Sequence, residues 1–169
     1  MTNWFKIYMY NTIMTKLEYT TLLKLIQENT TQTDEIIEQY ILLLSQLTQT
    51  PMLPKEIFMN NLCKITTMGV IYVCYHTKNE NKICIVGSGT IIIEPKIIRS
   101  GKSVGHIEDI VVDEKCRSMG ISKRIMENLF TFANENDCYK VILDCNPRLS
   151  DFYEKLGFEK HGIQMSKYF

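Results

Sequence analysis

Two neighbouring segments carry residue types that could bind an anion and move a proton. Residues 106–113 (HIEDIVVD) place Glu108 and Asp109 within an apolar run, where a carboxylate is costly to bury unless it has a partner. Residues 117–123 (RSMGISK) follow, and the apolar spacing after them predicts a helix that begins at Gly120. The first-turn amides of a helix have no partner within it and lie at the positive end of its dipole. This sequence therefore predicts a site for a phosphate or pyrophosphate.

The small and basic residues of the second segment fit this interpretation. Gly120 and Ser122 leave room for an anion to approach the backbone, and Arg117 and Lys123 supply opposite charge. An ordinary strand, loop and helix with a glycine in the turn also explains the spacing. The spacing alone leaves both interpretations open.

Asp144 and Tyr153 are further candidates for proton transfer. Asp144 ends the apolar run 141–143, and a carboxylate at the C-terminal end of a buried strand is placed to accept or orient an amine proton. A turn or helix cap is the alternative role for this residue. Tyr153 follows Phe152 near the start of a predicted helix, and an aromatic pair there is more often part of the core. Pattern alone favours a core role for Tyr153.

Hydrophobic spacing along the chain predicts the elements that position these residues. It predicts helices over residues 34–47, 54–63, 120–134 and 150–156, and strands over 70–76, 83–93, 106–112, 141–145 and from Phe158 onward, with 21–26 ambiguous between the two. The first two strands form a hairpin. The order predicts a mixed α+β or α/β domain with one sheet, covering residues 21–169 after an N-terminal arm of residues 1–20.

The composition disfavours several classes of function. The chain has 169 residues, with 19 Lys+Arg and 19 Asp+Glu, and this balance disfavours nucleic acid as the main partner. The six cysteines contain no CxxC pair and the histidines no HxxxH motif, so no zinc site or other metal is expected. The cysteines are expected to be small, mostly buried thiols in a reducing compartment. No apolar run approaches the ~18 residues of a membrane span, and residues 1–6 do not resemble a secretory signal. A cytoplasmic protein is expected.

The loop Arg117-x-x-Gly120-x-Ser122 resembles the [Arg/Gln]-x-x-Gly-x-[Gly/Ala] pyrophosphate loop of the GNAT acetyltransferases. Within that superfamily, the order and spacing of other segments resemble the eukaryotic-type glucosamine 6-phosphate N-acetyltransferases. These segments are residues 47–50 (LTQT), 105–109 (GHIED), 138–140 (CYK), 143–145 (LDC) and 152–158 (FYEKLGF). The resemblance extends from about residue 40 to the C-terminus. It implies a GNAT-type fold with one central, mostly antiparallel sheet flanked by helices.

This resemblance also implies a reaction. An acetyl group would pass from acetyl-CoA to the amine of glucosamine 6-phosphate by direct attack, without an acyl-enzyme. The product, N-acetylglucosamine 6-phosphate, would lie on the route to UDP-N-acetylglucosamine. None of the six cysteines is then needed as a nucleophile.

The same resemblance implies roles for individual residues. The catalytic set comprises Asp144 as base, Tyr153 as partner of the departing thiolate, and Glu108 and Asp109 near the amino sugar. Acetyl-CoA is expected to contact Ile110, Val111, Val112, Arg117, Ser118, Met119, Gly120, Ile121, Ser122, Lys123 and Tyr153. The amino-sugar phosphate is expected to contact Thr48, Lys96, Arg99, Glu108, Asp109, Tyr139, Lys140 and Asp144. Lys140 ranks first among the cations and Arg99 second, and a homodimer is implied, with residues 96–99 partly across its interface.

Two alternatives stay open on the sequence. Another acetyltransferase of the same fold would act on a polyamine, an amino acid or an aminoglycoside, and a polyamine enzyme would present an acidic pocket without phosphate-binding cations. A non-catalytic acyl-CoA-binding module is favoured by Leu149, where many family members carry Asn, and by Ser118 and Ser122, where glycine or alanine is commoner. The intact catalytic set argues against such a module.

Overall fold

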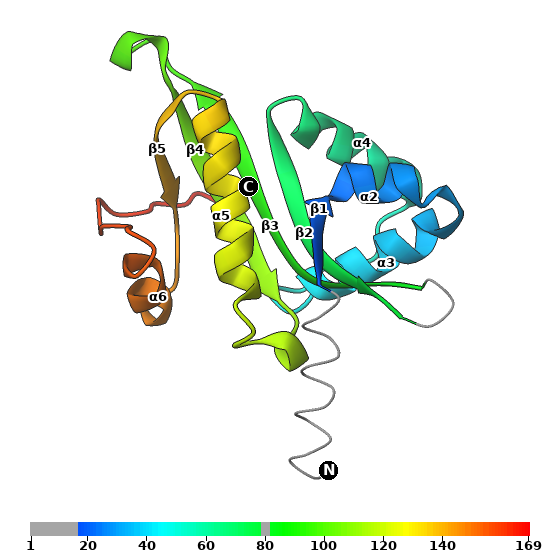
Figure 1. Ribbon diagram of the computed structural model, residues 1–169. Coiled ribbons are helices and arrows are strands. Elements are labelled where there is room, and N and C mark those ends of the chain that lie inside the picture. The colour runs from blue at the N-terminus through cyan, green and yellow to red at the C-terminus, as the bar shows by residue number, and fades with distance from the viewer. Residues whose placement is uncertain (1–16, 79–81) are drawn as a thin grey trace.

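The chain folds around one twisted sheet (Figure 1). The computed structural model describes residues 17–78 and 82–169. Within them, five strands lie in sequence order across the sheet: β1 (Glu18–Thr21), β2 (Gly69–Thr77), β3 (Ile83–Pro95), β4 (Ser103–Val112) and β5 (Cys138–Leu143). The pairs from β1 to β4 are antiparallel and β4–β5 is parallel. The parallel pair needs a crossover connection, which a helix between β4 and β5 provides.

Different helices cover the two faces of the sheet. The helices α2 (Leu22–Glu28), α3 (Thr33–Leu44) and α4 (Lys55–Thr66) pack on one face. The helix α5 (Ile121–Glu135) crosses the other face, and α6 (Ser150–Glu154) lies beside β5 (Figure 1). Short 3-10 turns lie at Thr30–Gln32, Arg99–Gly101, Glu114–Cys116 and Pro147–Leu149.

The amphipathic pattern of α5 explains its position. Ile121, Ile125 and Leu129 follow one another at intervals of four residues and are fully or almost fully buried, whereas Lys123 and Arg124 are exposed. The buried stripe packs on β3, β4 and β5, so the start of α5 is fixed next to the end of β4.

The predicted fold class is confirmed, because one mostly antiparallel sheet is flanked by helices. The ambiguous segment 21–26 contains a junction between a strand and a helix. Thr21 ends β1, and its hydroxyl accepts a hydrogen bond from the Lys24 amide at 3.2 Å as the N-cap of α2. Glu18–Thr21 pairs with β2, so the last residues of the predicted arm join the sheet. Residues 1–16 of the arm lie outside the described residues.

The predicted final strand from Phe158 onward is wrong. The Phe158 amide donates to the Tyr153 carbonyl at 3.1 Å, and the chain then leaves α6 without pairing with any strand of the described residues. A strand needs a neighbour for its amides and carbonyls, and residues 158–169 have none in the part of the chain that the structure describes. Their apolar composition is therefore left exposed. Ile163 is 92% exposed and Phe169 fully exposed.

The six cysteines, all within the described residues, are unpaired. Cys74 and Cys116 are buried, whereas Cys63 and Cys145 are exposed, so the expectation of mostly buried thiols holds for part of the set. Within residues 17–78 and 82–169, no helix is long and apolar enough to cross a membrane. No cluster of three or more metal-ligating side chains is present in that part of the chain either.

Candidate active site

The pairing of β4 with β5 stops before β4 ends, and the stretch of β4 beyond it, unpaired on that edge, is called the opening below. The parallel pairing of these strands ends at Ile107 opposite Leu143, although β4 continues to Val112. Beyond Ile107, the edge of β4 that faced β5 has no strand beside it in the described chain. The predicted cofactor contacts Ile110, Val111 and Val112 all lie on this free edge. Their backbone groups are placed to bond an extended ligand as an added strand would.

A bulge in β4 shapes the opening. Thr90 pairs with Glu108 and Ser88 pairs with Val111, so β4 has one more residue than β3 between these pairs. Asp109 within the bulge has a φ of 53°. The alternation of a regular strand, which would put Glu108 and Asp109 on opposite faces, is interrupted at this point.

Three predicted carboxylates interact at this opening. Glu108 is an exposed residue, yet partial burial of its carboxylate raises its pKa, and the neighbouring charges of Asp109 and Asp144 raise it further. The bulge of β4 and the end of β5 therefore bring Glu108, Asp109 and Asp144 within electrostatic range. Such an acidic cluster attracts a cationic or amine-bearing ligand.

The start of α5 forms the predicted anion site. Gly120 is the N-cap with a φ of 75°, and no side chain caps the first turn. No atom lies within 4 Å of the position that a Cβ of Gly120 would occupy, so the helix end is open. Ser118 also has a positive φ, of 65°. The amides after Gly120 are thus accessible to a pyrophosphate group.

The side chains of this loop divide into two groups. Met119 and Ile121 are buried in the core, so only their backbone can contact a ligand. Lys123 is exposed. Arg117 is also exposed, and its Nε donates to the Val112 carbonyl at 3.4 Å, while a guanidinium nitrogen lies 4.0 Å from Glu114. The loop therefore combines open amides with two cations at the surface.

Tyr153 lies on the short helix that follows β5. It is buried on α6, and its ring centroid is 5.0 Å from that of Phe152 and 5.9 Å from that of Phe158. Burial raises the pKa of the Tyr153 hydroxyl, and the nearby Cys145 thiol adds to this. The Tyr153 hydroxyl therefore keeps its proton at neutral pH.

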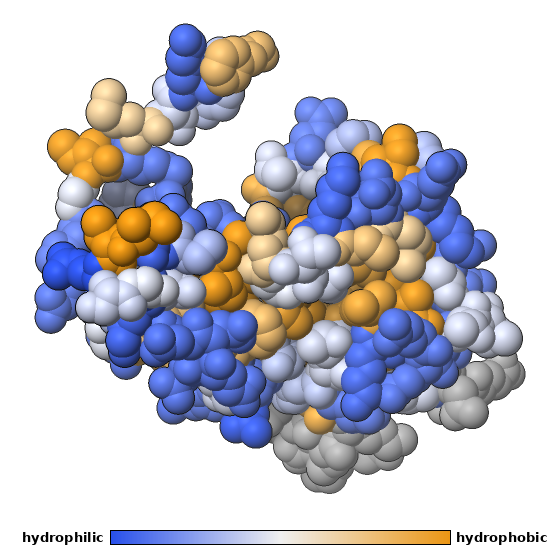
Figure 2. Space-filling model, turned by 90° about the horizontal axis from the view of Figure 1, so that it is seen from above, coloured by the Kyte–Doolittle hydropathy of each residue, from blue (hydrophilic) through white to orange (hydrophobic). Residues whose placement is uncertain are grey.

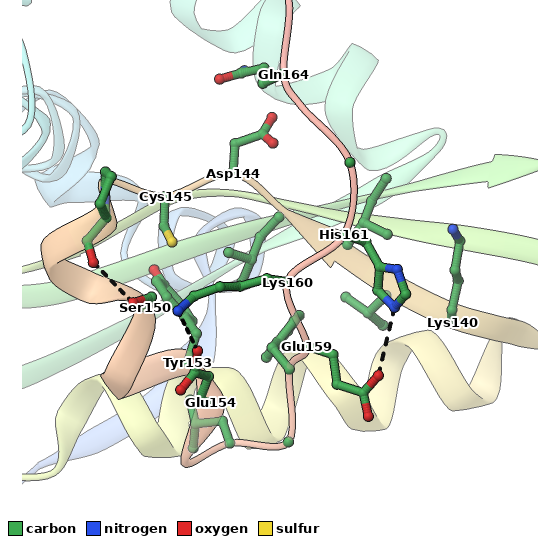
Figure 3. Close-up of a pocket in the computed structure, with 18 of the residues that line it drawn as sticks. Lys140, Asp144, Cys145, Ser150, Tyr153, Glu154, Glu159, Lys160, His161 and Gln164 are labelled. Atoms are coloured by element: carbon green, nitrogen blue, oxygen red, sulfur yellow. Dashed lines mark hydrogen bonds and ion pairs between the residues drawn. The ribbon is translucent and has the colours of Figure 1, made fainter.

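A cavity of about 1120 Å³ connects β5, α6 and the segment after α6 (Figure 3). Lys140, Asp144, Cys145 and Tyr153 all line it. The sequence analysis did not identify the part of its wall formed by residues 158–164. In that wall, Lys160 pairs with Glu154 at 2.8 Å, and His161 lies 3.6 Å from Glu159. The charged residues after Phe158 were the signal that this segment is not a buried strand.

Of the predicted phosphate-binding cations, two lie on the ring of Tyr139 and one is paired with a carboxylate. The guanidinium of Arg99 lies 5.6 Å and the ammonium of Lys140 5.8 Å from the centre of the Tyr139 ring, so the three predicted residues are brought together. Lys96 instead forms a 2.5 Å ion pair with Glu94, which also contacts His106 at 2.8 Å.

Thr48 lies exposed in the turn that follows α3. Two residues before it, the side-chain amide of Gln46 donates to the Asp113 carboxylate at 3.0 Å. This contact places the turn against the loop that follows β4. The sequence analysis did not identify Gln46, because an exposed glutamine after a helix carries no distinctive signal.

Comparisons with known proteins identify the family of this chain. The model of the Acetyltransferase (GNAT) family matches residues 42–158. The chain is 39% identical over 130 residues to the glucosamine 6-phosphate N-acetyltransferase of Arabidopsis thaliana, which covers 77% of this chain and 87% of that relative. It is 37% identical over 134 residues to a probable glucosamine 6-phosphate N-acetyltransferase 2 of Oryza sativa, with 77% and 80% covered.

Solved structures give the same result. A Trypanosoma brucei acetyltransferase superposes with a TM-score of 0.77 at 34% identity, covering 90% of this chain and 99% of that one. The crystal structure of glucosamine-6-phosphate N-acetyltransferase from Arabidopsis thaliana gives a TM-score of 0.74 at 35% identity, covering 90% and 98%.

Proposed function

Because the chain belongs to the GNAT acetyltransferase family, we propose that it transfers the acetyl group of acetyl-CoA to the amine of glucosamine 6-phosphate. The product would be N-acetylglucosamine 6-phosphate, a precursor of UDP-N-acetylglucosamine. The relatives named for this reaction align over most of the chain. One observation carries the choice of acceptor: Asp144 and Lys140 line the same cavity. An acceptor with both an amine and a phosphate matches this pairing of charges.

The opening between β4 and β5 fits acetyl-CoA. The free edge at residues 110–112 would bond the pantetheine arm, and the open amides after Gly120 would hold the pyrophosphate, with Arg117 and Lys123 as counter-charges. When bound, acetyl-CoA supplies the activated acetyl thioester. The Ile110 amide would polarise the thioester carbonyl.

The carboxylates and Tyr153 would handle the protons. Glu108 and Asp109 hold and orient the amino sugar, and Asp144 accepts a proton from the amine as its nitrogen bonds to the acetyl carbon. The carbon–sulfur bond breaks, and the Tyr153 hydroxyl donates its proton to the departing sulfur. The position of Tyr153 on the same cavity wall as Asp144 supports this role.

The acceptor phosphate would bind beside Tyr139. Lys140 and Arg99 lie on this ring and provide two positive charges. Lys96 is a weaker candidate for binding the phosphate, because Glu94 already neutralises its charge. Thr48 would add a hydroxyl contact from the turn after α3.

We further propose that the protein works as a cytoplasmic homodimer. The unpaired C-terminal segment carries almost fully exposed apolar and aromatic side chains, at Ile163, Met165, Tyr168 and Phe169. Figure 2 shows apolar side chains on a projection that stands clear of the body. A second copy of the chain would bury them. The six unpaired thiols favour a reducing compartment.

The test is release of free thiol from acetyl-CoA with glucosamine 6-phosphate, glucosamine, spermidine or no acceptor. We expect rapid release with glucosamine 6-phosphate and much slower release with the other acceptors. Preference for spermidine would retain the family and refute the acceptor. Binding of CoA without release by any acceptor would favour the non-catalytic module.

A further inference from the structure

The side-chain amide of Gln46 connects the end of α3 to the loop that follows β4. Its Nε2 donates to the Asp113 carboxylate at 3.0 Å, and its Oε1 accepts from the Glu114 backbone amide at 3.1 Å. The nitrogen and the oxygen of one side-chain amide thus bond two adjacent residues, which lie 67 and 68 positions away in the sequence. This two-point contact fixes the orientation of the loop as well as its distance from α3.

The residues that Gln46 holds begin the route into the anion site. Asp113 caps the 3-10 turn Glu114–Cys116, because its second carboxylate oxygen accepts from the Lys115 amide at 2.9 Å. Arg117 is the C-cap of that turn, and Gly120 follows at the start of α5. The loop between Asp113 and Gly120 therefore has Gln46 as an external support at its first residues.

Gln39 makes a similar contact elsewhere on the same chain segment. Its Nε2 donates to the Ile83 carbonyl at 2.8 Å and its Oε1 accepts from the Ile85 amide at 3.1 Å. Both glutamines thus anchor the α3 region by the same two-bond geometry. Gln39 reaches the start of β3, which carries none of the residues assigned to the site, whereas Gln46 reaches the cofactor loop.

We propose that Gln46 is a positioning residue for acetyl-CoA binding. By holding Asp113 and Glu114, it sets the position of Arg117 and of the open amides after Gly120. It also joins this loop to the turn that carries Thr48, so the acceptor side and the cofactor side of the site share one support. The proposal rests on the cofactor assigned under the proposed function and is independent of which amine accepts the acetyl group.

The first experiment compares Gln46→Ala with Gln39→Ala by calorimetric titration of CoA. Each variant loses two hydrogen bonds, and loss of this size at a binding loop should raise the Kd for CoA on the order of tenfold for Gln46→Ala. Gln39→Ala should lower the melting temperature while leaving the Kd within twofold of the parent. Equal Kd values for Gln46→Ala and the parent, or an equal rise in both variants, would overturn the proposal.

A second variant separates positioning from simple loss of packing. Gln46→Glu replaces the donor to Asp113 with a carboxylate, so two acids face each other where a 3.0 Å hydrogen bond now lies. Its Kd for CoA should exceed that of Gln46→Ala, because repulsion between the two carboxylates pushes the loop away from α3 instead of only releasing it. A Kd no higher than that of Gln46→Ala would count against the proposal.

Hydrogen exchange gives a readout that needs no ligand. The backbone amides of residues 114–120 should exchange faster in Gln46→Ala and at the parent rate in Gln39→Ala. Unchanged exchange in Gln46→Ala would refute the support itself. Failure of the parent to bind CoA would instead overturn the proposed function, so the two failures are distinguishable.

Discussion

At the scale of single residues, Tyr153 combines burial with a position on the wall of the cavity between β5 and α6. Its raised pKa means that the hydroxyl remains protonated through the physiological range. Tyr153→Phe removes the proton donor but keeps the ring that packs on Phe152 and Phe158. We expect kcat to fall about 100-fold, in the usual range for loss of a general acid, with little change in the Kd for CoA.

The pH profile tests the same assignment. Because the pKa of Tyr153 is raised above its usual value of about 10, the parent should lose no kcat from deprotonation of this group below that pH. A matched measurement of melting temperature checks that Tyr153→Phe is folded. A fully active Tyr153→Phe would remove this residue from the mechanism.

Lys140 tests phosphate recognition. Lys140→Ala removes a cation from the cavity wall and should raise KM for glucosamine 6-phosphate at least tenfold, because a charge-assisted hydrogen bond of about 1.5–3 kcal/mol is lost. KM for glucosamine, which has no phosphate, should be unaffected. Lys102→Ala is the control, since Lys102 pairs with Asp137 at 3.2 Å and does not line the cavity. Equal KM changes for both sugars would refute the role of Lys140.

Glu108 links the acidic cluster to stability. Its folded-state pKa is raised by burial and by Asp109 and Asp144, so ionisation of Glu108 opposes folding. A group with a raised pKa stabilises the fold at low pH, and this contribution is lost as the pH rises through that pKa. Glu108→Gln should therefore raise the melting temperature at pH 7 relative to the parent, but not at pH 4, and should lower activity. If Glu108→Gln changed the melting temperature by the same amount at pH 7 and at pH 4, the interaction of the three carboxylates would be contradicted.

At the scale of elements, the start of α5 depends on one backbone conformation. Gly120 has a φ of 75°, which a residue with a Cβ adopts at a cost of roughly 1–2 kcal/mol. The space around it is open, so Gly120→Ala acts through backbone strain and not through a clash. We expect weaker CoA binding in titration together with a lower melting temperature. Gly101→Ala, at a φ of 78° in equally open space but away from α5, should lower only the melting temperature.

The same elements show what sequence can predict. The loop and helix at Gly120 were predictable, because a glycine and a helical period are local signals in the chain. The bulge at Asp109 was not, since it depends on how β4 pairs with Ser88 and Thr90 of β3. The grouping of Arg99 with Tyr139 also depends on the sheet, which brings η3 (Arg99–Gly101) to the start of β5, and only the family resemblance anticipated it. A contact between distant segments produces no recognisable pattern in the sequence of either segment alone.

At the scale of the whole molecule, the C-terminal segment leaves apolar side chains exposed in a single copy of the chain. Its sequence has the apolar content of a strand, and the single chain offers it no strand to pair with in the described residues. The sequence analysis predicted a strand here from hydrophobic spacing, and the prediction failed because pairing needs a partner. The start of this segment also lines the cavity, so its position affects the site.

A dimer built through this segment makes a direct prediction. Replacing Ile163 and Met165 together by Asp removes two side chains that are 92% and 90% exposed in the single chain and adds two charges. We expect the double variant to sediment as a monomer in analytical ultracentrifugation, where the parent sediments as a dimer. Ser166→Asp adds a charge to the same segment without removing apolar surface and should remain dimeric. If the double variant kept the parent mass, the interface would lie elsewhere on the molecule, and a monomeric parent would refute the dimer itself.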